Sequence, residues 1–175
     1  MDVKYILRRL VSKFKPLTLH VECAWDDEVW EKIKTKALDG KVVRWYVITP
    51  ANYEYFKTNF NCQLSLKELH KKLYERYNWL IDNGQRLEPH IHFDLLSSMS
   101  YENQREFFES TSSWLKECFP KHNFSELVCG WWKYNKHTLK LCEEFGWKLI
   151  KHGEFGDMHD YDLIAKYLNV LYHIL

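Results

Sequence analysis

Apolar positions recur along the chain in two alternating patterns, one with the period of a strand and one with the period of a helix. The run 17–22 alternates apolar and polar residues, whereas the apolar positions of 29–37 fall three or four residues apart. Strands are predicted at 17–22, 42–48, 90–94, 126–129 and 147–150. Helices are predicted at 3–14, 29–37, from 49 onward, and at 66–80, 107–118, 135–145 and 163–175.

Helix boundary signals agree with this division. Ser65 to Glu68 forms a capping box, and Gly84 and Gly146 are suited to end helices. Asp26 or Asp27 would cap the helix that follows, although a catalytic role for the pair is the alternative.

Alternation of strands and helices is typical of parallel strands covered by helices. Such a sheet either closes into a barrel or stays open, and in both cases its ligands bind at the carboxyl ends of the strands. A length of 175 residues favours one domain, so 1–175 is treated as a single unit.

Candidate reactive residues gather at the predicted strand ends. His20 and Glu22 end the first strand, and a His-x-His-x-Asp run, His90 to Asp94, ends a middle strand. In a strand His90, His92 and Asp94 share one face, and two imidazoles with a carboxylate suit zinc or a similar divalent metal. The alternative is a strand whose polar face meets water.

Composition narrows the function classes. A net charge of +1 gives no electrostatic case for binding nucleic acid or a membrane surface. Five cysteines without a C-x-x-C pair favour a reducing compartment, and residues 1–15 lack the continuous apolar core of a signal peptide. The sequence therefore predicts a cytoplasmic protein without nucleic-acid or membrane partners, and its oligomeric state stays open.

Four segments together resemble the polysaccharide deacetylase superfamily of the NodB type, to which carbohydrate esterase family 4 belongs. They are Thr-Leu-His-Val-Glu at 18–22, His-Ile-His-Phe-Asp at 90–94, the aromatic loop and helix at 130–147, and His-Asp-Tyr-Asp-Leu at 159–163. The resemblance implies an irregular, trimmed (β/α) barrel of mostly parallel strands with outer helices. It also implies metal-dependent hydrolysis of amide C–N bonds in an N-acetylated sugar or a related small amide, with zinc as the expected metal.

The resemblance assigns roles to individual residues. His20 falls at the position of the catalytic base, and His159 at that of a late catalytic acid. The metal ligands fall on Glu22, His90 and Asp94, and His92 lies between the last two. Which of His92 and Asp94 binds the metal is left open.

Aromatic residues follow the fourth predicted strand. Trp131, Trp132 and Tyr134 would either stack on the apolar face of a sugar ring or plug the mouth of the barrel.

Three departures from the superfamily pattern bear on activity. His20 replaces an Asp, Asp94 replaces a His, and 128–130 lacks an Arg that supports the base. His20 is therefore either the base or a fourth ligand. The alternative function is a catalytically degenerate deacetylase-like barrel that acts as a binding or interaction protein. A metallo-phosphoesterase is disfavoured because basic or glycine-rich phosphate contacts are not evident near the metal motif.

Overall fold

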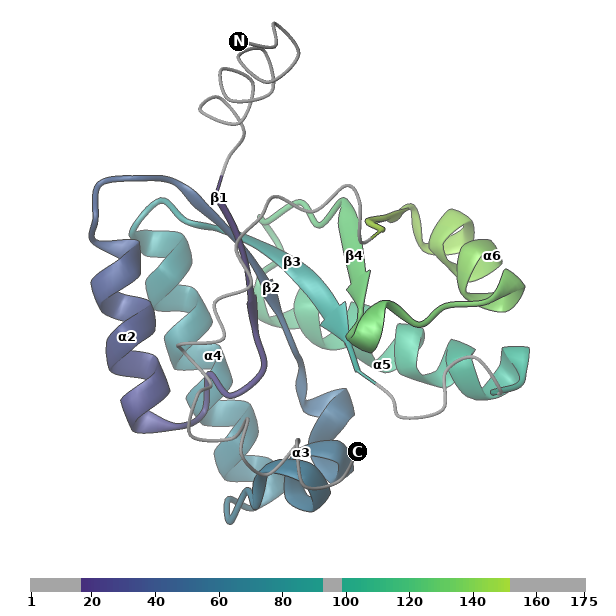
Figure 1. Cartoon of the computed structure of the whole chain (residues 1–175), viewed down its shortest axis with the longest axis horizontal. Helices are drawn as coiled ribbons and strands as arrows, with labels where there is room; N and C mark the ends of the chain where they lie inside the picture. The colour runs from purple at the N-terminus through teal and green to yellow at the C-terminus, as the bar shows by residue number, and fades with distance from the viewer. Residues whose placement is uncertain (1–16, 93–98, 152–175) are drawn as a thin grey trace, which may run out of the picture.

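The structure is a computed structural model that describes residues 17–92 and 99–151 (Figure 1). The helices predicted at 3–14 and 163–175, and the candidate residues Asp94 and His159, lie outside the described residues.

Five parallel strands form one sheet in the order β1-β2-β3-β4-β5. They are β1 (Leu17–Val21), β2 (Val43–Val47), β3 (Arg86–Ile91), β4 (Glu126–Cys129) and β5 (Lys148–Leu149). The α helices between them are α2 (Asp27–Ala37), α3 (Tyr53–Phe60), α4 (Leu66–Asp82), α5 (Tyr101–Cys118) and α6 (Lys136–Phe145), with 3₁₀ turns η1 (Pro50–Asn52) and η3 (Gly130–Trp132). The predicted parallel α/β architecture is confirmed, and among the described strands the sheet is open.

The strand order places the helices together on one face of the sheet. Sequential parallel strands joined by right-handed crossovers bring each connecting helix to the same side, as in a (β/α) barrel. Helices α2 and α4 lie side by side, and α5 packs on α6 (Figure 1). The described part of the chain is thus a segment of a barrel wall, with its helices outside.

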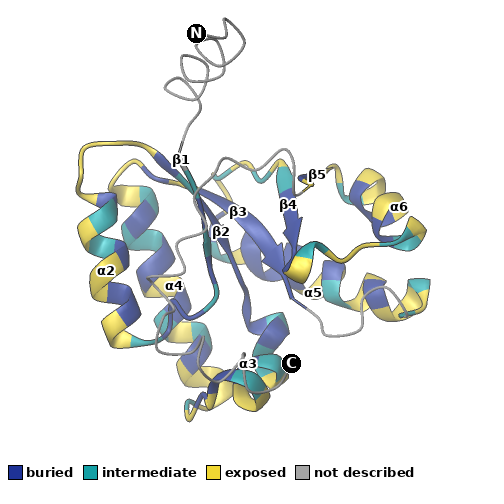
Figure 2. Ribbon diagram, viewed as in Figure 1, coloured by how far each residue is buried: buried dark blue, intermediate teal, exposed yellow. Residues whose placement is uncertain are grey.

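Alternation along the strands separates two environments. Leu19, Trp45, Leu87 and Leu127 point outward into an apolar core under the helices, where each buried large side chain contributes roughly 1.5–3 kcal/mol. The strands are buried, while the outer surfaces of α2 and α6 are exposed (Figure 2). The inner face carries polar residues, including His20 beside Tyr46.

Capping residues explain where the helices begin and end. Ser65 and Glu68 complete the predicted capping box of α4, and Gly146 ends α6 in the left-handed conformation. Asp26 caps α2 by accepting hydrogen bonds from the backbone N–H of Glu28 and Val29, both at 3.0 Å.

The strand predicted at 90–94 is displaced. β3 begins at Arg86 and ends at Ile91, because its ladder with β2 starts at the pair Arg44–Arg86. The alternating histidines predict a strand that lies too close to the carboxyl end of the segment. The hydrogen-bonded ladder instead extends toward the amino end, to Arg86.

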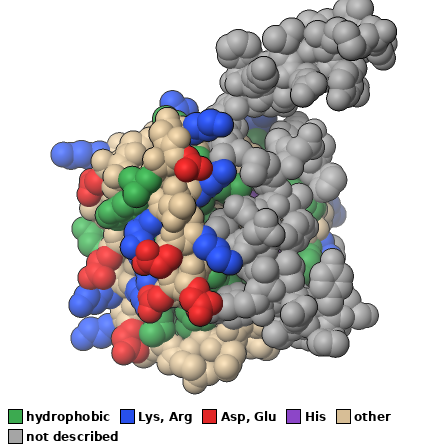
Figure 3. Space-filling view, turned by 60° about the vertical axis from the view of Figure 1, so that its left-hand side comes forward, with side chains coloured by type: hydrophobic (Ala, Val, Ile, Leu, Met, Phe, Trp, Pro, Cys, Tyr) green, Lys and Arg blue, Asp and Glu red, His purple; other side chains and the backbone are tan. Residues whose placement is uncertain are grey.

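The exposed surface mixes charges of both signs. Acidic and basic side chains are interspersed over the face turned forward in Figure 3. On α2, Lys34 pairs with Glu31 at 2.7 Å. Among the described residues, no helix is both long enough and apolar enough to cross a membrane.

Candidate metal centre

Three ligand groups meet at the carboxyl edge of the sheet. Glu22 directly follows β1, His90 lies near the end of β3, and His92 comes just after it. One ligand atom from each lies within 4.8 Å of the others. Glu22 Oε1 is 3.8 Å from His90 Nε2 and 3.5 Å from His92 Nε2. Ligand atoms around tetrahedral zinc lie about 3.3 Å apart, given bonds of about 2.0–2.1 Å, so the group fits such an ion with little adjustment.

His90 is oriented as a metal ligand usually is. Its Nδ1 lies 3.0 Å from the carbonyl oxygen of Val128, which can only accept, so Nδ1 carries the proton. The lone pair of Nε2 is thereby left available. Nε2 is buried without a hydrogen-bond partner. A backbone carbonyl that fixes the tautomer of a metal-binding histidine is a common supporting arrangement.

Electrostatics favour the metal-binding forms of the other two groups. Burial lowers the pKa of His92 to about 4, so its imidazole is neutral at pH 7. Burial alone would raise the pKa of Glu22, but His92 and His90 outweigh it and hold that pKa below its usual value. A carboxylate beside two imidazoles is a suitable donor set for zinc or a related divalent ion.

Gly130 gives the ring of His92 its space. A Cβ at this position would lie closer than 3.0 Å to three atoms of the imidazole. Gly130 directly follows β4, the strand that neighbours β3, so its missing side chain allows His92 to lie against the sheet. The need for glycine here comes from close packing.

Two residues near His92 have no candidate role in the sequence prediction. The Asn52 side chain donates a hydrogen bond to the backbone carbonyl of His92. The ring of Tyr55 stacks on His92 with centroids 4.2 Å apart, and its hydroxyl lies 3.2 Å from Nε2. Both residues follow β2. The rule that functional groups lie after the carboxyl ends of parallel strands could therefore have identified them from the sequence.

His20 is enclosed by aromatic rings. Its imidazole stacks on His90 with centroids 5.0 Å apart and planes 16° apart, and Trp132 lies 5.2 Å away. Tyr46 meets it edge-on at 5.9 Å. His20 lies outside the group of three ligand atoms, and its assignment as base or fourth ligand stays a prediction.

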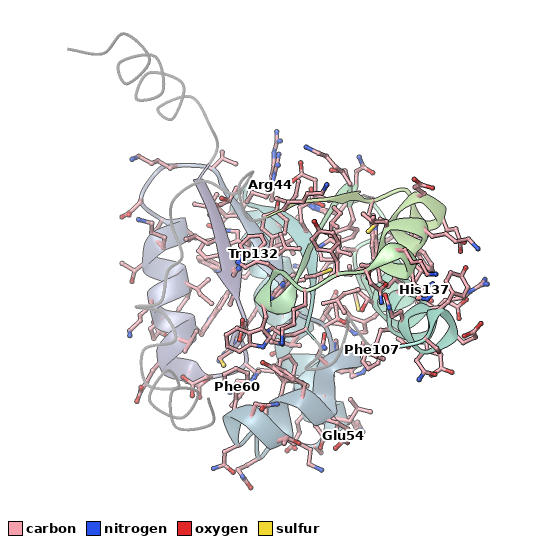
Figure 4. The ribbon with its side chains drawn as sticks, turned by 45° about the vertical axis from the view of Figure 1, so that its right-hand side comes forward. Arg44, Glu54, Phe60, Phe107, Trp132 and His137 are labelled. Carbon is pink, nitrogen blue, oxygen red and sulfur yellow. The ribbon has the colours of Figure 1, made fainter. Side chains whose placement is uncertain are left out.

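The aromatic loop adopts an unusual backbone. Trp131 and Trp132 have φ values of 53° and 57°, a left-handed conformation that is strained for bulky residues. Trp132 lies beside His20, and Figure 4 shows it between Arg44 of β2 and Phe60 at the end of α3. Trp131 meets His92 edge-on at 5.4 Å and is 44% exposed, so its ring is accessible beside the candidate ligands.

Other candidates have different surroundings. Tyr134 is exposed, with Lys151 Nζ 6.0 Å from its ring centre. Asp27 pairs with Arg76 and lies 2.7 Å from Lys72 Nζ, so it joins α2 to α4. With Asp26 acting as a helix cap, both aspartates have structural partners.

A second polar cluster lies on the same face of the sheet, toward the amino ends of the strands. Glu126 accepts hydrogen bonds from Arg44 at 2.6 Å and from the Tyr46 hydroxyl. Glu88 accepts three, from the backbone N–H groups of Ser125 and Glu126 and from the Ser125 hydroxyl. Burial nevertheless raises the pKa of Glu88, and burial with the nearby Glu126 carboxylate raises that of Tyr46.

The five-stranded parallel sheet with its outer helices is an α/β fold that solved structures share. BA3943, a CE4 family pseudoenzyme from Bacillus anthracis, matches with a TM-score of 0.56 and 13% identity, over 79% of this chain and 43% of that one. A BA3943 mutant with restored enzymatic activity matches with a TM-score of 0.55 and 13% identity, over 78% and 44%.

These matches confirm the predicted α/β fold. The chain spans less than half the length of these neighbours. No protein-family model and no curated protein matches the sequence.

Proposed function

We propose that the protein is a metal-dependent hydrolase of amide C–N bonds that removes the acetyl group of an N-acetylated sugar or a related small amide. The observation that carries the proposal is the convergence of Glu22, His90 and His92 at the carboxyl edge of a deacetylase-like sheet. A divalent metal there, with zinc the first candidate, would lower the pKa of bound water toward about 7 and polarise the substrate carbonyl.

The surrounding residues would perform the remaining tasks. His20, stacked on His90, is the proposed proton acceptor, and His159 is the proposed acid for the leaving amine. Trp131 presents an exposed ring edge-on to His92, where it can stack on the apolar face of a sugar.

Metal content tests the proposal. After incubation with zinc, cobalt or nickel, the wild type should retain about one divalent ion per chain by mass spectrometry. Glu22→Gln should weaken metal binding more than about 100-fold, because removing a ligand costs more than removing a residue that supports one. His137→Asn, on α6 (Figure 4), is a matched control that should retain the ion. A wild type that binds none of the three metals would refute the hydrolase proposal.

The second candidate is a degenerate barrel that binds a ligand without turnover. His20 favours it, because an enclosed imidazole occupies the position of the superfamily's carboxylate base. His20→Asp separates the two candidates in an assay of acetate release from N-acetylated sugars. A silent wild type whose His20→Asp variant is active supports the degenerate barrel, whereas an active wild type supports the hydrolase.

A further inference from the structure

Tyr55 is fixed to the metal centre by contacts of its ring and of its helix. The fully buried Phe56 and the nearly buried Phe60 anchor α3, and Phe60 packs edge-on against Tyr55. The preceding turn is joined to His92 through the hydrogen bond from Asn52. Tyr55 and His92 are therefore held together by two independent contacts, one between rings and one to the backbone.

The stacked geometry determines what the hydroxyl can do. The planes of Tyr55 and His92 differ by 28°, so the phenol lies over the imidazole. The lone pair of Nε2 lies in the imidazole plane, and Glu22 Oε1 is 3.5 Å from this nitrogen. The Tyr55 hydroxyl thus lies beside the direction in which Nε2 would bind a metal, and a bound ion would replace the hydrogen bond between the hydroxyl and Nε2.

The Tyr55 hydroxyl lies about as far from His92 Nε2 as a second atom bound to the same metal ion would lie. It lies 3.2 Å from Nε2, close to the spacing of about 3.3 Å between two atoms that share a tetrahedral zinc ion. A phenol ordinarily keeps its proton at neutral pH and is then a hydrogen-bond donor. His92 Nε2 ceases to be an acceptor when its lone pair binds a metal, so the Tyr55 proton would then turn to another oxygen nearby.

We propose that the Tyr55 hydroxyl donates a hydrogen bond to the acyl oxygen of the substrate at the Glu22–His90–His92 centre. This inference rests on the proposed function and adds a residue that touches the reacting group. A donor aimed at the oxygen on which charge develops is a general means of stabilising the transition state of acyl transfer.

Acetate, the product of deacetylation, is the probe. Its affinity is measured on the cobalt-loaded protein by titration of the visible cobalt spectrum, and the metal content of each variant is measured in parallel. Tyr55→Phe keeps the stacked ring and removes only the hydroxyl. Acetate affinity should fall about 10-fold, because a hydrogen bond to a charged group is lost, while metal content and melting temperature stay unchanged.

Tyr53→Phe is the matched control on the same helix. The Tyr53 hydroxyl donates to the carbonyl of Leu64 at 3.0 Å, and its removal should leave acetate affinity unchanged. Equal acetate affinity in Tyr55→Phe and the wild type would overturn the role of Tyr55 and leave the proposed function standing. Loss of the metal in Tyr55→Phe would also overturn it, because Tyr55 would then be a ligand. A wild type without metal would refute the proposed function itself.

Discussion

Two polar clusters share the inner face of the sheet, and they differ in how their polar atoms are satisfied. In the first, around Glu126 and Glu88, the carboxylates accept hydrogen bonds from neighbouring side chains and backbone N–H groups. In the second, around Glu22, the buried atoms Nε2 of His90 and Nδ1 of His92 have no hydrogen-bond partner.

Burying a polar atom without a partner costs roughly 1–3 kcal/mol. The cluster around Glu126 avoids this cost for its carboxylates through its own contacts, which is typical of a structural network. In the cluster around Glu22, Nε2 of His90 faces the Glu22 carboxylate and bears this cost until a ligand binds it, which is typical of a site whose partner comes from outside the chain. The cluster around Glu126 leaves Nε of Arg44 without a partner, and this atom is a donor that cannot bind a metal. The cluster around Glu22 leaves an imidazole nitrogen, which can. The two clusters therefore differ in the kind of buried atom that lacks a partner.

Acid should destabilise the Glu22 cluster most. The pKa of His92 is about 6.5 unfolded and about 4 folded, so in this window only the unfolded chain takes up the proton. Stability is fully present above pH 6.5 and is lost as pH falls toward 4, by up to about 3 kcal/mol for the metal-free protein. The depressed pKa of Glu22 acts in the same direction at lower pH.

Urea denaturation in the presence of a chelator, at pH 7, 5.5 and 4.5, measures this loss. The variant His92→Gln should show a shallower dependence on pH over the same range. Parallel curves for the wild type and the variant would show that His92 is not the titrating group.

Gly130→Ala should be the next largest perturbation. The added methyl group would overlap the His92 ring, and overpacking of this kind costs roughly 1–3 kcal/mol. Metal affinity should fall as well, because the ring must move. If the ring is the cause, adding His92→Ala should recover part of the lost stability, and a double-mutant cycle gives that coupling energy. Additive effects would contradict the explanation.

Glu126→Gln should have the smallest effect and should affect only the structural cluster. Removing the charge that Arg44 and Tyr46 bind should cost about 1–2 kcal/mol in the free energy of unfolding, because the Arg44–Glu126 pair is largely shielded from water. Metal content should be unchanged. Glu109→Gln, in the exposed pair with Arg105, is the control and should change stability by less than about 0.5 kcal/mol. Loss of metal in Glu126→Gln would remove the distinction between the clusters.

The fold was predictable from the sequence wherever local chemistry decides the outcome. The β-prone run at 42–48, the capping box at Ser65 and the glycine after α6 depend on neighbouring residues, and each lies where the structure has it. The extent of β3 depended on its ladder with β2, so its limits were displaced by several residues.

The site was predictable in part for the same reason. Glu22, His90 and His92 follow strands of one parallel sheet, so their convergence follows from topology. Asn52 and Tyr55 reach His92 from the connection after β2, and Gly130 matters because β4 pairs with β3. Such contacts arise between segments about 40 residues apart, and no local pattern specifies them.

The sequential strand order has a consequence for folding kinetics. Glu22 follows β1 and His90 lies in β3, with β2 between them, so the ligands meet only after three strands have paired. Each pairing closes a loop of more than 20 residues, as between Leu17 and Val43 or Arg44 and Arg86. A metal that binds only the paired sheet stabilises the native state but hardly stabilises the transition state for folding. It should therefore slow unfolding and leave the folding rate nearly unchanged. The metal site would then form last during folding and be lost first during unfolding.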